Sequence, residues 1–116
     1  MTVKECYDAF GGNYEEALTR LMKDERIAKY LGKFRDATDY AQFLEALDKE
    51  QYEDAFRYMH NLKGVSLNLS MTRLGKESSE LCEAFRGGKP TVDITEMLAA
   101  VKREYDTVID AVSKLG

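Results

Sequence analysis

The chain has 116 residues, of which 44% are hydrophobic and 33% are charged, with one Pro and no Trp. This length and balance predict a single domain whose core needs no disulfides, since folding at this size buries roughly two-thirds of the unfolded surface. The 21 acidic residues outnumber the 17 basic ones and give a net charge of -4, so we expect no nucleic-acid partner.

Cysteine spacing and the N-terminal stretch exclude further classes of protein. Cys6 and Cys82 lie far apart with no recurrent spacing, so they indicate neither a disulfide scaffold nor a zinc site. With a single histidine, no metal site is expected. Met1 leads into a charged stretch, and no run of about 18 apolar residues occurs. We therefore expect a cytoplasmic protein that is neither secreted nor embedded in a membrane.

Two short helices are predicted at the start of the chain. Thr2 and Glu5 have the spacing of a capping box for the first helix, and Gly11-Gly12 ends it. Asn13 is placed to begin the second. The apolar stripe of that second helix consists of Ala17, Leu18 and Leu21.

A long helix is predicted from residue 24 to about residue 49. Its stripe at helical spacing consists of Ile27, Leu31, Phe34, Thr38, Ala41, Leu44 and Leu47. A break near Ala37-Thr38-Asp39 is conceivable because Thr38 could cap a second helix. Phe34 and Ala41 nevertheless keep the stripe in phase across that point, and the pattern favours one continuous helix.

Three more amphipathic helices follow. The first, over about residues 50–69, has core positions at Ala55, Met59, Leu62, Ser66 and Leu69. The next begins after Ser70-Met71-Thr72, ends at Gly87-Gly88, and has core positions at Leu74, Ser78, Leu81 and Phe85. The last is capped by Thr91 or Asp93, with a stripe of Ile94, Leu98, Val101, Tyr105, Val108, Val112 and Leu115.

This element order predicts an all-α protein, an up-down four-helix bundle preceded by two short N-terminal helices. We interpret residues 1–23 as N-terminal cap helices and residues 24–116 as the bundle of one domain. The four apolar stripes are able to satisfy one another, so we expect a monomer.

The outer face of the helix over residues 50–69 is unusual for a solvated bundle helix. At about 100° per residue, the core stripe leaves Phe56, His60, Lys63, Gly64 and Leu67 on its flank and far side. Two large apolar residues thus surround the only histidine, which indicates a docking patch. The pattern leaves open whether Phe56 and Leu67 face a partner or fold onto a neighbouring helix.

The residue types on this face fit nucleophilic chemistry. A neutral imidazole such as that of His60 is a nucleophile near neutral pH, and Lys63 would place a positive charge beside an anion on the ring. Gly64 costs a helix roughly 1 kcal/mol relative to Ala, and its missing Cβ would allow another molecule close to His60. Taken alone, Gly64 or Gly32 could instead permit close helix packing, and for Gly32 we adopt that reading.

The segment His60-Asn61-Leu62-Lys63-Gly64 resembles the H-x-L-K-G signature of histidine-containing phosphotransfer (HPt) domains. In that family the signature lies mid-helix in a four-helix bundle, and the resemblance spans essentially the whole chain. Ser70 replaces the Gly common at the following turn, and Met59 replaces the Ala common before the histidine. Leu67 is larger than the residue often found there, which would narrow the choice of partner.

The resemblance implies a function for each residue of this face. His60 would accept a phosphoryl group from the aspartyl phosphate of a response-regulator receiver domain and pass it to another receiver. Lys63 would stabilise the phosphate, Gly64 would give the partner clearance, and Phe56 and Leu67 would form the docking patch. The expected partners are receiver domains of a hybrid histidine kinase and a response regulator. The chain would need no cofactor, with Mg²⁺ expected in the partner receiver.

Such a chain would be a covalent phosphohistidine carrier rather than an enzyme, and it has no P-loop or kinase glycine-rich loop. Two alternatives come from other classes. A receiver-docking module that is never phosphorylated would keep the bundle, but the intact His60 argues against it. A histidine-kinase dimerisation fragment also carries a phosphorylated histidine. The four long helices predicted here are enough for a bundle within one chain, and this argues against a fragment that has to dimerise.

Overall fold

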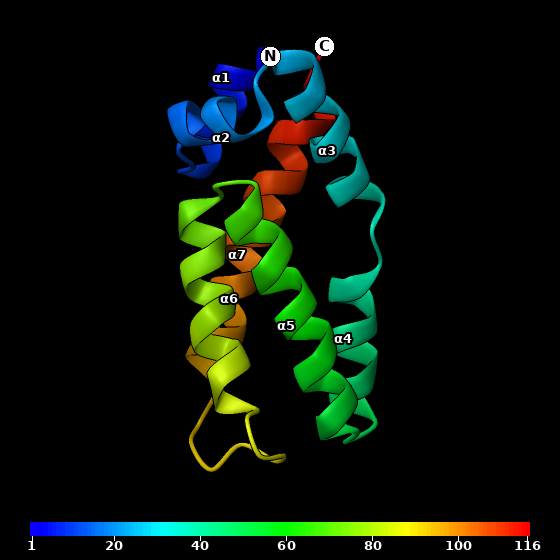
Figure 1. The fold of residues 1–116 in the computed structure, drawn as a ribbon. Coiled ribbons are helices and arrows are strands. Elements are labelled where there is room, and N and C mark those ends of the chain that lie inside the picture. The colour runs from blue at the N-terminus through cyan, green and yellow to red at the C-terminus, as the bar shows by residue number, and fades with distance from the viewer.

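Seven α-helices and no strand form residues 1–116 in the computed structural model (Figure 1). In chain order they are α1 (Val3–Phe10), α2 (Tyr14–Leu21), α3 (Asp24–Asp36), α4 (Asp39–Asp48), α5 (Tyr52–Asn68), α6 (Thr72–Ala84) and α7 (Thr95–Ser113). The predicted all-α bundle with two short N-terminal helices is confirmed. No helix has both the length and the apolar character that crossing a membrane requires.

The long helices alternate in direction along the bundle (Figure 1). α4 packs on α5, α5 on α6, and α6 on α7. Aromatic contacts join α7 to α3 and α4. The Tyr105 ring of α7 stacks on Tyr40 of α4 at a centroid distance of 4.3 Å and lies 5.7 Å from the Phe34 ring of α3. The molecule is elongated, with extents of 41 × 21 × 20 Å, and both termini lie at the end that α1 and α2 cover.

The predicted caps of the two short helices are present. Glu5 N donates to Thr2 Oγ1 at 3.1 Å and Thr2 N donates to Glu5 Oε1 at 2.9 Å, which completes the capping box. Gly11 ends α1 in the left-handed conformation at φ 67°. The Asn13 side chain accepts a hydrogen bond from the backbone of Glu16 at the start of α2.

The prediction of one continuous helix over residues 24–49 is wrong. Ala37 has extended backbone angles between α3 and α4, and the Thr38 side chain caps no backbone amide. A straight helix would place Phe34 and Phe43, nine positions apart, on opposite faces. The break rotates α4 so that both rings are buried, while the expected stripe positions Thr38, Ala41 and Leu44 are exposed.

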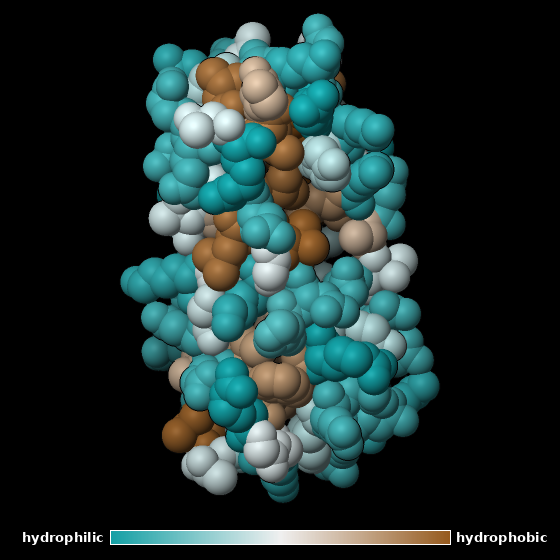
Figure 2. All heavy atoms as spheres, in the orientation of Figure 1, coloured by the Kyte–Doolittle hydropathy of each residue, from teal (hydrophilic) through white to brown (hydrophobic).

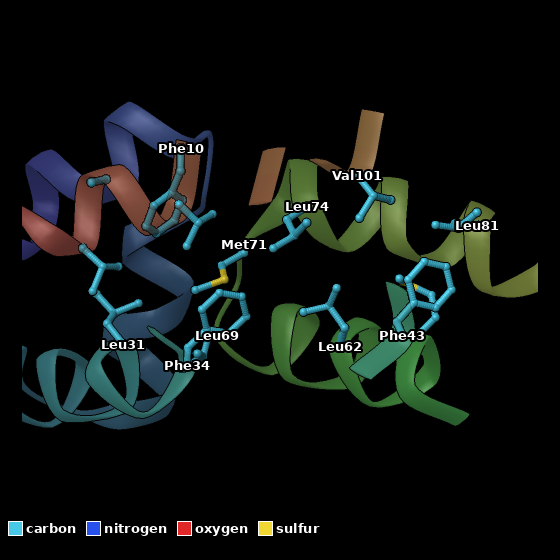
Figure 3. Packing of buried hydrophobic residues seen from close by; sticks show 14 of the residues in the cluster. Phe10, Leu31, Phe34, Phe43, Leu62, Leu69, Met71, Leu74, Leu81 and Val101 are labelled. Carbon is cyan, nitrogen blue, oxygen red and sulfur yellow. The ribbon is translucent and has the colours of Figure 1, made fainter. Parts of the chain in front are cut away.

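The predicted core positions of α5 and α6 are all buried, and Leu69 and Phe85 are buried at the ends of these helices. In α7 the stripe is buried at Val101, Val108 and Val112 and half-buried at its other positions. Figure 3 shows these side chains meeting along the bundle axis, with Leu62 facing Leu74 and Val101. The N-cap position of α7 is Ile94, and no side chain caps the helix there, so the predicted cap by Thr91 or Asp93 is wrong. The Asp93 carboxylate instead accepts from Thr95 N at 2.9 Å, in the turn that leads into α7.

Candidate functional site

His60 lies on the exposed side of α5. The buried positions Ala55, Met59, Leu62 and Ser66 form one stripe of this helix. Because they face the bundle, helical geometry turns His60 outward, and its side chain is exposed. The fold thus holds an accessible imidazole midway along a helix that is packed against two neighbours.

Phe56 is one turn before His60 and connects it to the end of α6. The Phe56 and His60 rings have centroids 5.9 Å apart. The Arg86 guanidinium lies on the Phe56 ring, with its central carbon 5.3 Å from the ring centroid. Phe56 is half-buried and packs against the core, so it both contacts the neighbouring helix and contributes to the surface beside His60.

Lys63 is half-buried on the flank of α5 that faces α6. Burial raises the pKa of the Cys82 thiol, and the positive charges of Lys63 and Arg86 oppose this effect. Two cations therefore lie near Cys82, on the side of the site that adjoins α6. The thiol itself is buried and protonated near neutral pH.

Gly64 is one turn after His60 and has open space above it. A Cβ atom built on Gly64 meets nothing within 4 Å. Internal helix packing therefore does not explain this glycine. At Gly32 the nearest atom to a built Cβ is Arg35 Nη2 at 3.9 Å, so the close packing expected there is wrong as well, and nothing in the structure explains Gly32.

Leu67 of α5 packs against α6 and is also open to solvent. Its Cδ2 methyl group is 2.6 Å from the position of a Cβ built on Gly75 of α6. A larger residue at position 75 would displace this methyl group. Leu67 still has an exposed fraction of 45%, so it folds partly onto its neighbour and remains available to a partner.

The C-terminal end of α5 is held by the short N-terminal helices. Arg20 of α2 donates to the carbonyl oxygens of Leu67 and Asn68 and, at 3.2 Å, to Ser70 Oγ. The Tyr7 hydroxyl donates to Leu69 O at 2.7 Å. The Leu67 carbonyl also accepts from Ser70 N, whereas Arg20 and Tyr7 provide donors for the carbonyls of Asn68 and Leu69 at the helix end. The helix that carries His60 therefore has a fixed end.

Ser70 forms the turn after α5 in a conformation that favours glycine. Its φ is 56°, in the left-handed region. The residue is buried, and its hydroxyl donates to Glu16 Oε1 at 2.7 Å. This bond and the one from Arg20 anchor a serine at a position where the resemblance led us to expect glycine.

The structure gathers all five predicted site residues on one surface, because they share α5. Sequence reasoning missed Arg86, Gly75 and Arg20. Arg86 and Arg20 are exposed cations without a periodic signal, and Gly75 is a helical glycine that only its contact with Leu67 explains. The site combines one accessible imidazole, two nearby cations and an open approach over Gly64, an arrangement suited to receiving an anionic group.

A family model described as Hpt domain matches residues 30–113. Comparisons with curated proteins and with solved structures gave no match. Hpt domains are phosphocarrier modules of phosphorelays that interact with receiver domains, and they are not classical enzymes. The match covers well over half of the sequence and includes the whole of α5, so the chain belongs to the Hpt domain family.

Proposed function

We propose that this chain is a phosphohistidine carrier in which His60 accepts a phosphoryl group from one receiver domain and passes it to another. The observation that carries the proposal is the exposed imidazole of His60 on α5, within an Hpt domain, with open space above Gly64 one turn away. The donor and acceptor would be receivers of a hybrid histidine kinase and of a response regulator.

In the forward step, a ring nitrogen of His60 attacks the phosphorus of the receiver's aspartyl phosphate. A nitrogen–phosphorus bond forms, the phosphorus–oxygen bond to the aspartate breaks, and the aspartate leaves as a free carboxylate. The second ring nitrogen keeps its proton until solvent accepts it. The reverse sequence delivers the phosphoryl group to the aspartate of the next receiver, with Mg²⁺ supplied by the receiver.

The neighbours of His60 act on this step through charge and access. Lys63 places an ammonium group on the flank of the phosphorylated ring, where it favours the dianion. Gly64 leaves room for the receiver backbone, and reacting atoms need to come within about 3 to 3.5 Å. Phe56 and Leu67 supply apolar contact area on either side of the histidine. The proposed carrier is a monomer, and the packing of α4 on α5, α5 on α6 and α6 on α7 supports this part of the proposal.

The test is incubation of the full chain with a receiver domain labelled at its aspartate, in the presence of Mg²⁺. We expect alkali-stable, acid-labile label on the wild-type chain and none on His60→Gln. Because His60 is exposed, the variant should keep the helical content and melting temperature of the wild type. Full labelling of His60→Gln would overturn the proposal, whereas receiver binding without any labelling of the wild type would favour a docking module.

A further inference from the structure

The positive charges of this acidic chain are unevenly distributed. Four cations lie on or next to α3 and join no ion pair in the structure: Lys23, Arg26, Lys29 and Lys33. At about 100° per residue they occupy a single arc of that helix together with the exposed Tyr30 ring. The Lys33 ammonium lies 5.3 Å from the centroid of that ring. We call these five residues the basic arc.

An apolar groove of about 360 Å³ adjoins the basic arc, between α2, α3 and α5. Its apolar lining includes Leu21, Phe34, Ala37, Val65 and Leu69, and its charged residues are Arg20 and Lys33, with no carboxylate. A shallower hollow along α3 shares Tyr30 with the groove and contains Glu25 as its single carboxylate. Figure 2 shows the corresponding apolar strip in the upper half of the molecule, bordered by hydrophilic atoms.

The groove continues the surface that carries His60. Val65 and Asn68 line it from α5. On that helix Gly64, Asn68 and Val65 lie about 40°, 80° and 140° from His60 in the same direction. Val65 is 40% exposed although it is apolar. A partner positioned over His60 and Gly64 would therefore reach the groove without crossing another helix.

We propose that this groove and the basic arc bind an acidic amphipathic helix of a partner protein. An apolar floor selects apolar side chains, and unpaired cations on one rim select carboxylates on the adjoining side of the same segment. The groove has helical walls and the chain has no strand, so no sheet edge is available to pair with an extended peptide. A helix satisfies its own backbone hydrogen bonds and needs none from the groove.

Other anionic partners fit this surface less well. A nucleic-acid backbone gains nothing from an apolar floor, and the net charge of -4 opposes it over longer distances. The inference rests on the proposed function in one respect: it assigns the acidic helix to the receiver that exchanges phosphate with His60. Charge on that helix would then help to select the correct receiver and accelerate its association.

The first experiment measures peptide binding to the ¹⁵N-labelled full chain. The probes are a synthetic amphipathic helix with a leucine stripe flanked by glutamates and a matched peptide with lysines in place of those glutamates. We expect the acidic peptide to shift the amide signals of α3 and of Val65 and Asn68, and the lysine peptide to shift none. Equal effects of both peptides, or shifts confined to other helices, would overturn the proposal.

Two matched double variants distinguish the effect of the positive charge on α3 from the effect of the net charge of the chain. Lys29→Gln/Lys33→Gln should weaken binding of the acidic peptide about fivefold at low salt. Lys76→Gln/Lys89→Gln removes the same charge from α6 and its following loop and should leave affinity unchanged. Val65→Asn should weaken binding at low and high salt alike. Equal losses in the two lysine pairs, or tighter binding to phosphatidylserine vesicles or single-stranded DNA than to the acidic peptide, would contradict the proposal.

The second experiment links this surface to phosphotransfer. Lys29→Gln/Lys33→Gln should slow label transfer from the receiver at low salt and have little effect at high salt, where screening is strong. His60→Gln should bind the acidic peptide normally. Peptide binding without labelling of His60 by any receiver would support the docking surface while rejecting the proposed function. If Lys29→Gln/Lys33→Gln transfers label at the wild-type rate at low salt, the assignment of this surface to the receiver is wrong.

Discussion

The guanidinium group of Arg86 lies on the ring of Phe56, with 5.3 Å between its central carbon and the ring centroid. Phe56 in turn lies one helical turn from His60, with 5.9 Å between the two ring centroids. Arg86 comes from the end of α6, so it brings a second element to the surface around His60. Its side chain is held by an ion pair with Glu83, at an Nε–Oε2 distance of 3.0 Å.

Replacing Arg86 with Gln should slow phosphotransfer without unfolding the domain. The exposed pair with Glu83 contributes little stability, but loss of a cation near a phosphorylated imidazole should lower the transfer rate on the order of fivefold. The rate of label transfer and a thermal melt measure the two effects. Arg103→Gln on α7, which removes an exposed arginine paired with Glu104, is the matched control and should transfer at the wild-type rate.

Arg20 should contribute more to stability than its exposure indicates. Arg20→Ala leaves the carbonyls of Leu67 and Asn68 without their side-chain donor, and we expect a loss of about 0.5 to 1.5 kcal/mol in the free energy of unfolding. Arg35 is a matched control, because the two arginine side chains are 44% and 47% exposed. Arg35 pairs only with the adjacent Asp36, so Arg35→Ala should change stability by less than about 0.5 kcal/mol. Equal losses in urea denaturation would contradict the role of Arg20 at this helix end.

The buried Tyr7 should make the domain sensitive to alkaline pH. Burial raises the pKa of the Tyr7 hydroxyl well above its ordinary value of 10.0. The unfolded chain therefore releases the proton first, and the contribution to stability is complete below about pH 10 and is lost as the pH rises toward the folded-state pKa, by up to about 1.4 kcal/mol per pH unit. Urea denaturation at pH 8 and at successive values above pH 10 measures this slope.

Tyr7→Phe provides the control for the alkaline effect. At pH 8 the variant should lose about 1 kcal/mol, because the Leu69 carbonyl loses its donor. Above pH 10 its stability should fall less steeply than that of the wild type. Parallel slopes in the two proteins would assign the alkaline loss to other groups, such as Tyr40 and Tyr105, whose pKa values burial also raises.

The helices of the second half of the chain were predictable because each has a single apolar stripe with one phase. In the segment from residue 24 to residue 49, two phases compete. Phe34 and Ala41 fit one continuous helix, whereas Phe43 and Ala46 fit a helix rotated by about half a turn. The break lets both phases be buried: Phe34 is buried in α3, and Phe43 is fully buried in α4 and packs edge-on against Phe85 at a centroid distance of 5.5 Å.

The site was predictable to the extent that it lies on one helix. His60, Lys63 and Gly64 come together through helical geometry alone, so their spacing was sufficient. The contacts of Arg86 with Phe56 and of Leu67 with Gly75 join different helices and depend on how closely α5 and α6 pack. No periodic pattern in the sequence encodes that distance, and exposed arginines are common on any charged surface.

Substitutions at Gly64 distinguish a role in receiver access to His60 from a role in helix packing. Since a Cβ at this position meets nothing within 4 Å, Gly64→Ala should keep or raise the free energy of unfolding, by up to about 1 kcal/mol, through helix propensity. Gly64→Gln should also fold, because its longer side chain projects into the same open space. That side chain stands one turn from His60, where the receiver has to approach.

Transfer and stability should therefore change in opposite directions in this pair of variants. A displacement of about 1 Å between reacting atoms is able to cost on the order of 100-fold in rate, so Gly64→Gln should transfer far more slowly than the wild type, and Gly64→Ala only modestly so. Melting curves and label transfer from the phosphorylated receiver measure both properties on the same samples. If Gly64→Gln unfolds, the glycine serves packing after all. If it folds and transfers at the wild-type rate, the receiver does not approach over Gly64, and the docking role of Phe56 and Leu67 fails with it.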